Sequence, residues 1–231
     1  MIEVRGLAKY FGRFSALRDL HISVPQGQFI ALFGRNGAGK TTFLRILAGL
    51  SRPSAGAVLV HSAKPGSQGA REVIGYLSHN TALYLDLTAL ENLRFYARLL
   101  DLPALGADLE DRIARVGLAG RAREPVRNYS RGMQQRLAIA RAFLHDPGVL
   151  LLDEPFTGLD REGTEFLQNY LSESRARNKT CLMAIHDAPL GYALSDRLVV
   201  IERGVVALDL PRQSVTLDEF QGRYRALTEE R

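Results

Sequence analysis

A short stretch near the start of the chain combines glycines, a lysine and a threonine at a spacing suited to binding phosphate. It reads Gly-Arg-Asn-Gly-Ala-Gly-Lys-Thr over residues 34–41, which is the pattern of a glycine, four residues, then Gly-Lys-Thr. The glycines allow backbone turns that other residues avoid, so that successive N–H groups can point inward at phosphate oxygens. Lys40 then places a positive charge on the terminal phosphates, and the Thr41 hydroxyl holds Mg²⁺. The stretch predicts a nucleoside triphosphate site.

The segments on either side of this loop predict the elements that position it. Residues 28–33 form a short apolar run typical of a buried strand, and residues 42–48 carry apolar side chains at helical spacing. A helix that begins here directs its N-terminus and its dipole at the loop. The alternative is a glycine-rich turn that matches by accident, which residue usage predicts in about one chain of this length in a hundred. The flanking strand and helix make that accident rarer still.

Two further apolar runs also end in residues that could do chemistry. Residues 149–152 lead into Asp153 and Glu154, and residues 181–185 lead into His186. In a parallel α/β sheet, ligands bind beyond the carboxyl ends of the strands, so all three strand ends point at one crevice. Successive strand residues face opposite ways, which gives the two acidic residues separate roles. We expect Asp153 to support Mg²⁺ through water and Glu154 to orient an attacking water as general base. For the Asp-Glu-Pro sequence, the alternative is a capping turn with a purely structural role. We expect His186 to contact the γ-phosphate and the attacking water.

The rest of the chain predicts a mixed α/β fold with one helical segment. Residues 2–5 and 16–24 favour an antiparallel opening, with Tyr10 and Phe11 on a turn between them as a core-facing pair or as functional aromatics. Strands are also predicted at 57–60 and 73–77, and a hairpin at 198–201 and 205–208. From Thr88 to about Val126 the pattern is helical, which we interpret as an insert in the α/β core. Ser130 is a good N-cap before a helix over 134–144, and a polar helix is predicted over 216–231.

Composition bounds the class of protein. The chain has 231 residues, a 46% hydrophobic and a 24% charged content, and a formal net charge of +5. These values are those of one ordinary globular domain, and no apolar run approaches the roughly 20 residues of a membrane helix. The sequence therefore predicts an intracellular protein with at most a peripheral membrane role. The basic residues are scattered, so a solvated surface is expected rather than a nucleic-acid partner.

With these residues in hand, the chain resembles the ATP-binding subunit of ABC transporters over essentially its whole length. Residues 34–41 are similar to that family's Walker A motif and residues 149–154 to its Walker B motif. Residues 129–136 resemble its signature motif, and residues 157–160 its D-loop. His186 matches its switch histidine, and Phe11 the aromatic that stacks on adenine. Six motifs in the family's order make this match highly specific.

The resemblance implies a fold, cofactors and partners. The fold is α/β, a P-loop NTPase core with a mainly parallel sheet, an N-terminal antiparallel β portion and a helical subdomain insert. We expect one domain over 1–231, with its core at 1–78 and 135–215, the insert at about 79–134 and a short C-terminal tail at 216–231. Two such domains would pair head to tail, so that each ATP lies between one Walker A loop and the partner's signature loop. The other expected partner is a membrane-spanning permease subunit, and the expected location is the cytoplasmic inner face of the cell membrane.

The same resemblance assigns site residues. ATP would contact Phe11, Gly34, Arg35, Asn36, Gly37, Ala38, Gly39, Lys40, Thr41, Thr42, Ser130, Gly132 and Asp160. Mg²⁺ would be held by Thr41, Asp153 and His79, and catalysis would fall to Glu154, His186 and Lys40. The cluster Ala82 to Leu85 would receive a cytoplasmic helix of the permease.

Two departures from the family pattern carry consequences. Tyr129, Arg131 and Met133 replace three residues of the usual Leu-Ser-Gly-Gly-Gln signature, which leaves Ser130 and Gly132 to act. His79 stands where the Q-loop glutamine is expected. His79 either takes the place of this glutamine as a neutral imidazole, or the coupling of ATP hydrolysis to transport runs differently in this chain.

Residues 78–79 and 87–96 resemble the subset of the family that exports haem or serves cytochrome c maturation, although multidrug exporters carry close variants. Other readings are a soluble ABC ATPase of translation or DNA repair, and a small-molecule kinase. A soluble ABC ATPase usually has two nucleotide domains or a long coiled-coil insert, and this sequence shows neither. The signature helix and His186 argue against a small-molecule kinase.

Overall fold

Strands with fully buried apolar residues build the central sheet. The computed structural model describes residues 2–102 and 106–229. Its six-stranded sheet has the order β5-β6-β7-β3-β8-β9, parallel except for β9. The strands are β3 (Phe29–Phe33), β5 (Ile74–Leu77), β6 (Val149–Asp153), β7 (Thr180–Ala184), β8 (Arg197–Glu202) and β9 (Val205–Pro211). Every residue of β3, β6 and β7 is buried, as in parallel strands covered on both faces.

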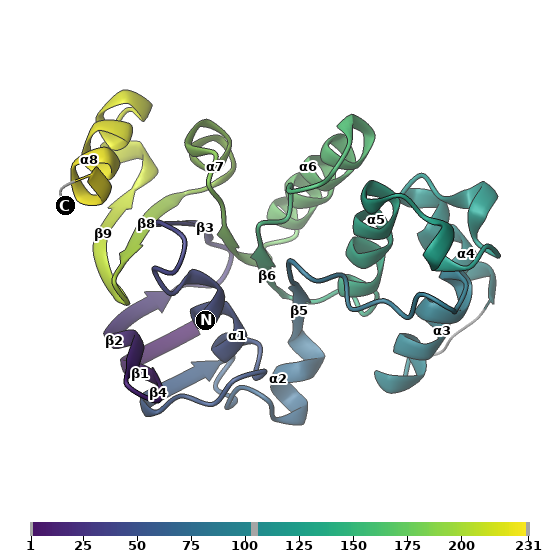
Figure 1. Cartoon of the computed structure of the whole chain (residues 1–231), viewed down its shortest axis with the longest axis horizontal. Helices are drawn as coiled ribbons and strands as arrows, with labels where there is room; N and C mark the ends of the chain where they lie inside the picture. The colour runs from purple at the N-terminus through teal and green to yellow at the C-terminus, as the bar shows by residue number, and fades with distance from the viewer. Residues whose placement is uncertain (1, 103–105, 230–231) are drawn as a thin grey trace.

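Alternate residues of the sheet pack against two different layers. Ile30 and Leu32 of β3 face a cluster shared with α1 (Lys40–Leu47) and the N-terminal strands. Phe29, Ala31 and Phe33 face a cluster shared with helices on the other side. These helices are α5 (Arg131–Ala142), α6 (Arg161–Ala176), α7 (Ala188–Leu194) and α8 (Leu217–Glu229). Figure 1 shows α6, α7 and α8 above the sheet and α1 below it.

The predicted antiparallel opening forms a second sheet of order β2-β1-β4, with β1 (Ile2–Phe11), β2 (Phe14–Val24) and β4 (Ala55–Val60). Both predicted strands are longer than expected, and the hairpin turns at Gly12 and Arg13 with Phe11 opposite Phe14. Tyr10 and Phe11 are 51% and 52% exposed, so the core-facing interpretation of this pair is wrong. Strand pairing in β1 turns these rings outward at the end of the hairpin.

The helical segment has an apolar core of its own. It contains α3 (Ala89–Leu99), α4 (Gly106–Arg115), two short 3₁₀ turns (Ala119–Arg121 and Val126–Asn128) and the start of α5. Leu93, Ile113 and Val116 are buried there together with Leu137 of α5. The other side of α5 packs through Ile139 on the central sheet. α5 therefore joins the helical segment to the sheet, as Figure 1 shows at right.

Several boundaries differ from the sequence predictions for local reasons. α5 begins at Arg131, three residues before the predicted start, because the Ser130 side chain accepts a hydrogen bond from the Met133 N–H and caps the helix there. The helices α2 (Gln68–Val73) and α7 were not predicted, because each is too short for a clear apolar periodicity. Both are capped by a side chain, from Ser67 and Asp187.

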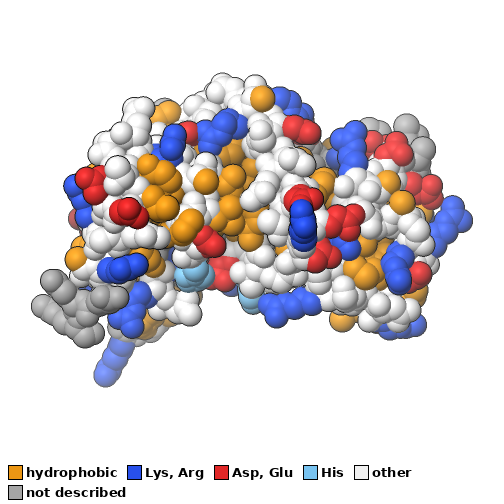
Figure 2. Space-filling view, turned by 90° about the horizontal axis from the view of Figure 1, so that it is seen from above, with side chains coloured by type: hydrophobic (Ala, Val, Ile, Leu, Met, Phe, Trp, Pro, Cys, Tyr) orange, Lys and Arg blue, Asp and Glu red, His pale blue; other side chains and the backbone are white. Residues whose placement is uncertain are grey.

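The surface in Figure 2 mixes charges of both signs. Basic side chains on this face are scattered among acidic ones, with apolar side chains visible between the charged ones. Within residues 2–102 and 106–229, no helix combines the length and the apolar character needed to cross a bilayer.

Candidate active site

The three predicted strand ends lie side by side in the structure. β6 and β7 are neighbours, and β3 pairs with the other edge of β7. The Thr41 hydroxyl donates to Asp153 Oδ1 at 3.0 Å, which joins the glycine-rich loop to the end of β6. Glu154 Oε1 lies 2.7 Å from His186 Nε2, which joins the ends of β6 and β7. The residues expected to converge therefore lie in contact at the carboxyl edge of the sheet.

The glycine-rich loop exposes a helix N-terminus to its hollow. Residues 34, 37 and 39 all have positive φ, as predicted from their glycines. Gly39 is the N-cap of α1 and offers no side-chain acceptor, and no acidic residue lies in the first turn. The first N–H groups of α1 therefore lack the partners that a capping side chain would supply. Such a terminus favours a bound phosphate through its N–H groups and its dipole.

Two loop glycines are required by space as well as by conformation. A Cβ atom at Gly34 would lie 2.2 Å from the Ile201 carbonyl oxygen, where φ is +145°. One at Gly39 would lie 2.7 Å from the Ala16 carbonyl oxygen, where φ is +115°. Both contacts are with backbone, which cannot turn aside. The loop therefore packs closely against β2 and β8.

Lys40 lies inside the loop that it is expected to serve. Its ammonium donates to the carbonyl oxygens of Gly34, at 2.6 Å, and Arg35, at 3.1 Å, and the residue is 5% exposed. Burial lowers the pKa of Lys40, while the nearby carboxylates of Glu154 and Asp153 raise it. A positive charge held this close to the N-terminus of α1 suits the terminal phosphates of a nucleotide.

Thr41 and Asp153 have the oxygen donors that Mg²⁺ requires. Asp153 is 2% exposed, and burial raises its pKa, against the lowering effects of the Thr41 hydroxyl, Lys40 and His79. Mg²⁺ usually binds one or two protein oxygens together with waters and phosphate oxygens, so this pair fits the ion. Among the described residues, no three His, Cys, Asp or Glu side chains gather as a metal site.

His79 is exposed in the loop after β5, near enough to Asp153 to lower the pKa of that carboxyl. Imidazole is a poor ligand for Mg²⁺. A contact through water suits His79 better than direct binding of the ion.

Glu154 adopts an unusual backbone conformation at this site. Its φ is +53°, although its position before Pro155 predicts an extended backbone. The Glu154 N–H donates to the Ala184 carbonyl oxygen at 3.0 Å, and the side chain reaches His186. A non-glycine residue in the left-handed region costs about 1–3 kcal/mol and typically persists at functional sites. With this backbone conformation, Glu154 lines the pocket at the loop.

That pocket has an aromatic edge formed by the first hairpin. Phe11 and Phe14 line it together with residues 35–42 of the loop and helix start. Lys9 Nζ lies 4.9 Å from the centre of the Phe11 ring. Phe14 is 61% exposed and was not singled out from the sequence. The sequence could have indicated Phe14 only through its position: it lies across the hairpin turn from Phe11, at the end of the paired strand.

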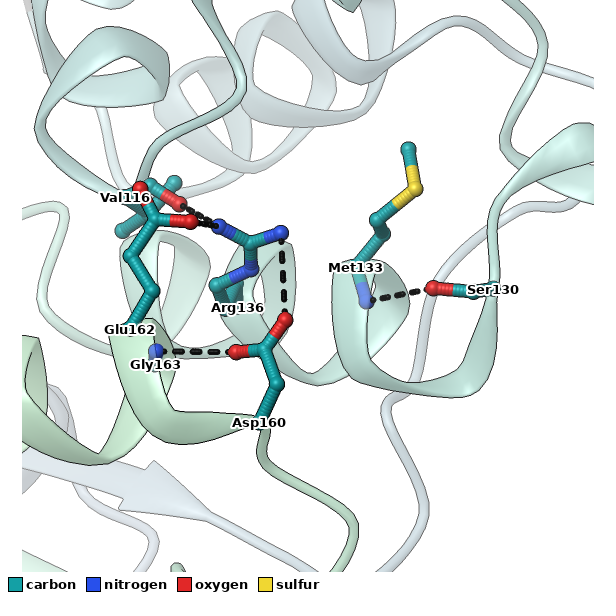
Figure 3. Close-up of polar contacts among 7 residues, drawn as sticks. All are labelled: Val116, Ser130, Met133, Arg136, Asp160, Glu162 and Gly163. Atoms are coloured by element: carbon teal, nitrogen blue, oxygen red, sulfur yellow. Dashed lines mark hydrogen bonds and ion pairs between the residues drawn. The ribbon is translucent and has the colours of Figure 1, made fainter.

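Ser130, Gly132 and Asp160 lie apart from this pocket and close to one another. Ser130 is exposed at the N-terminus of α5. A Cβ atom at Gly132 would lie 3.7 Å from Asp160 Oδ2. Asp160 caps α6, accepting from the Gly163 N–H at 2.9 Å, as Figure 3 shows. None of the three lines the pocket at the glycine-rich loop of the same chain.

The sequence pattern of the family described as "ABC transporter" matches residues 17–157, more than half of the chain. The chain belongs to the ABC transporter family. The ABC transporter ATP-binding protein NatA of Bacillus subtilis is 37% identical over 196 residues, which cover 83% of this chain and 80% of NatA. The aliphatic sulfonates import ATP-binding protein SsuB 2 of Pseudomonas aeruginosa is 38% identical over 217 residues, which cover 91% and 75%.

Solved structures agree with this ABC assignment. An ATP-binding subunit of an ABC transporter matches with a TM-score of 0.86 at 28% identity, covering 97% of this chain and 99% of that one. A bacterial ABC transporter cassette solved as a dimer matches with a TM-score of 0.82 at 26% identity, covering 92% and 99%. The predicted fold class is therefore confirmed.

ABC ATP-binding subunits are ATPases that bind ATP with Mg²⁺, form dimers of cassettes and pair with membrane permease subunits. The predicted activity, cofactors and classes of partner are confirmed at this level.

Proposed function

We propose that this chain is the motor subunit of an ABC transporter and that two copies hydrolyse ATP at sites closed between them, head to tail. The observation that carries the proposal is the separation of two half-sites on one chain. The loop, Asp153, Glu154 and His186 form one half, and the exposed N-terminus of α5 with Ser130 and Gly132 forms the other. In this proposal a second copy, facing the other way, brings the second half to the first.

In this proposal each side chain has one role. Lys40 and the first N–H groups of α1 bind the β- and γ-phosphates, and Phe11 stacks on the adenine. Thr41 and Asp153 hold Mg²⁺, which neutralises phosphate charge when bound. Glu154 accepts the proton of the attacking water, and His186, 2.7 Å away, holds Glu154 and the water in line. Ser130 and the Gly132 N–H of the second copy stabilise charge on the γ-phosphate.

The test uses a variant that binds ATP and hydrolyses it slowly. Glu154→Gln should form a dimer with ATP, seen by light scattering. Adding Ser130→Arg should abolish that dimer, because a bulky cation fills the space that the partner's γ-phosphate needs. The monomer should stay folded, losing only the contribution of one N-cap, about 0.5–2 kcal/mol, because Ser130 is exposed but caps α5. A dimer that survives Ser130→Arg would sink the head-to-tail arrangement.

The cargo is set by the permease in this proposal. Residues 78–79 and 87–96 favour haem export or cytochrome c maturation. Of the relatives compared above, SsuB 2 is named for the import of aliphatic sulfonates. The fluoroquinolones export ATP-binding protein MT2762 of Mycobacterium tuberculosis, 36% identical over 218 residues, is also named for other cargo. A multidrug-type exporter subunit is therefore the second candidate. Haem-stimulated ATPase activity of the chain bound to its permease would favour the first, and stimulation by amphipathic drugs the second.

We also propose where the chain works and how it divides. Docking on a permease would hold it at the inner, cytoplasmic face of the membrane. We retain a core at 1–78 and 135–215, an insert at 79–134 and a tail at 216–231, which the separate apolar cluster around α3 and α4 supports. Because α5 packs on both parts, we expect it to carry movement of the insert to the core.

A further inference from the structure

A buried arginine joins three elements behind the exposed turn of α5. Arg136 lies on α5, six residues after Ser130, and is 7% exposed. Its Nη1 donates to Glu162 Oε2 at 2.8 Å and to the Val116 carbonyl oxygen at 3.3 Å. Its Nη2 lies 3.5 Å from Asp160 Oδ2. Figure 3 shows the guanidinium between the end of α4 and the start of α6.

Two glycines make room for this guanidinium. A Cβ atom at Gly117 would lie 2.6 Å from Arg136 Nη1 and 2.5 Å from Glu162 Oε1, where φ is +72°. A Cβ atom at Gly163 would lie 3.1 Å from Arg136 Cγ. The backbone on both sides therefore fits the arginine closely.

Stability alone is a poor reason for an arginine at this position. Taking a charge out of water is costly, and well-packed apolar residues often replace buried ion pairs without loss. Arg136 Nε is buried with no hydrogen-bond partner, which adds to that cost. Its carboxylate partners stay largely in water, with the Asp160 and Glu162 side chains 51% and 69% exposed. The arrangement suits a residue that fixes geometry.

We infer that Arg136 is a positioning residue that holds the Ser130–Gly132 turn in register with the Asp160 loop and the end of α4. The two exposed segments then meet a second copy of the chain as one rigid surface. The inference rests on the proposed head-to-tail dimer. It predicts that Arg136 acts on closure of the dimer and leaves binding of ATP to a single chain unchanged.

The test compares Arg136→Met, Arg136→Lys and Glu162→Gln, each made alone and with Glu154→Gln. Methionine fills the space but has no guanidinium. Lysine keeps the positive charge but cannot contact Glu162 and Asp160 through two separate nitrogens. Glu162→Gln leaves the arginine in place and weakens one contact. Glu165→Gln is the matched control, because Glu165 lies on the same helix in an exposed ion pair with Arg161.

We expect Arg136→Met to bind ATP within about twofold of the parent but to need at least about tenfold more protein for ATP-driven dimerisation. Its kcat should fall more than its KM rises. Arg136→Lys should recover part of this loss. Glu162→Gln should also raise the protein concentration needed for dimerisation, but by less, and Glu165→Gln should match the parent.

Four outcomes would overturn the inference. If Glu154→Gln alone forms no dimer with ATP, the proposed function fails and this inference with it. If that parent dimerises and the Arg136→Met form dimerises equally well, only the inference fails. The same holds if Arg136→Met lowers the unfolding temperature while dimerisation well below that temperature is unchanged. Should Arg136→Met not fold, Glu162→Gln decides alone, and normal dimerisation of that variant overturns the inference.

Discussion

Glu154 and His186 are in contact at the centre of the site. This contact orients the Glu154 carboxylate, the proposed general base. The Glu154 carboxylate is 27% exposed, enough to meet water, and His186 lies against one of its oxygens. We predict that Glu154→Gln keeps ATP binding but loses most turnover, since glutamine keeps the size and loses the base. The expected loss in phosphate release is ~10²–10⁴-fold. The exposed Glu173→Gln serves as control, and turnover at the parent rate would remove Glu154 from the mechanism.

Lys40 tests the glycine-rich loop independently of the base. Its ammonium is the one charged side-chain group that reaches into the loop from α1, where the other donors are N–H dipoles. We predict that Lys40→Ala weakens ATP binding itself by at least about tenfold, consistent with 1.5–3 kcal/mol for a hydrogen bond to a charged group. Titration calorimetry measures this, with the exposed Lys64→Ala as control. Unchanged affinity would contradict the assignment of the loop.

Residue roles could be predicted where the signal is local and not where it depends on packing. The loop was identified because its glycines, lysine and threonine are consecutive, and Glu154 because it ends an apolar run. The contacts of Arg136 were not predictable, since Glu162 and Val116 lie 26 and 20 residues away along the chain. The left-handed φ of Glu154 was missed as well, because the hydrogen bond that its N–H donates to the Ala184 carbonyl oxygen of the neighbouring strand outweighs the local preference before proline.

At the scale of elements, continuous apolar runs were the reliable signal. β3, β6 and β7 were located within a residue or two, because both faces of a central parallel strand are buried. α2 and α7 were missed, because six or seven residues make too few turns to reveal a period. α8 was predicted as a polar helix, but its packing on the core was not evident from its composition.

α8 ties the end of the described chain to the strand that carries the loop. Phe220 is fully buried, its ring centre 4.8 Å from that of Phe33, and Gly34 follows Phe33 directly. Arg35 Nη1 donates to the Thr228 carbonyl oxygen at 3.0 Å. The helix therefore supports the glycine-rich loop from behind.

We predict that Phe220→Ala lowers the free energy of unfolding by about 3–5 kcal/mol, the usual cost of emptying a buried phenylalanine site. Urea unfolding followed by circular dichroism measures the change. Arg225→Ala, an exposed position on the same helix, is the control and should stay within about 0.5 kcal/mol. A loss under 1 kcal/mol for Phe220→Ala would mean that α8 does not contribute to the core.

At the scale of the whole molecule, the helical segment presents an apolar surface of four residues. Tyr84, Leu85, Phe95 and Leu99 are 48%, 48%, 40% and 68% exposed. The fully buried Asn92 holds the loop before α3, accepting from the Tyr84 N–H at 2.8 Å and donating to the Tyr84 and Thr88 carbonyl oxygens, both at 2.9 Å. The loop is thus fixed with two apolar side chains partly in water. Such a surface suits an apolar partner.

We therefore predict that Tyr84→Asp together with Leu85→Asp leaves the ATPase activity of the isolated chain nearly intact and abolishes its association with the permease. A charge at the centre of an interface typically costs about 2 kcal/mol or more, so two should reduce membrane recovery by well over tenfold. The measurement is sedimentation with membranes of the source cells, with the retained membrane protein identified by mass spectrometry. Leu50→Asp is the control, because Leu50 is 59% exposed in the turn that follows α1, outside the helical segment. Equal loss of activity and folding in the double variant would mean that Tyr84 and Leu85 belong to the core, and the docking surface would have to lie elsewhere.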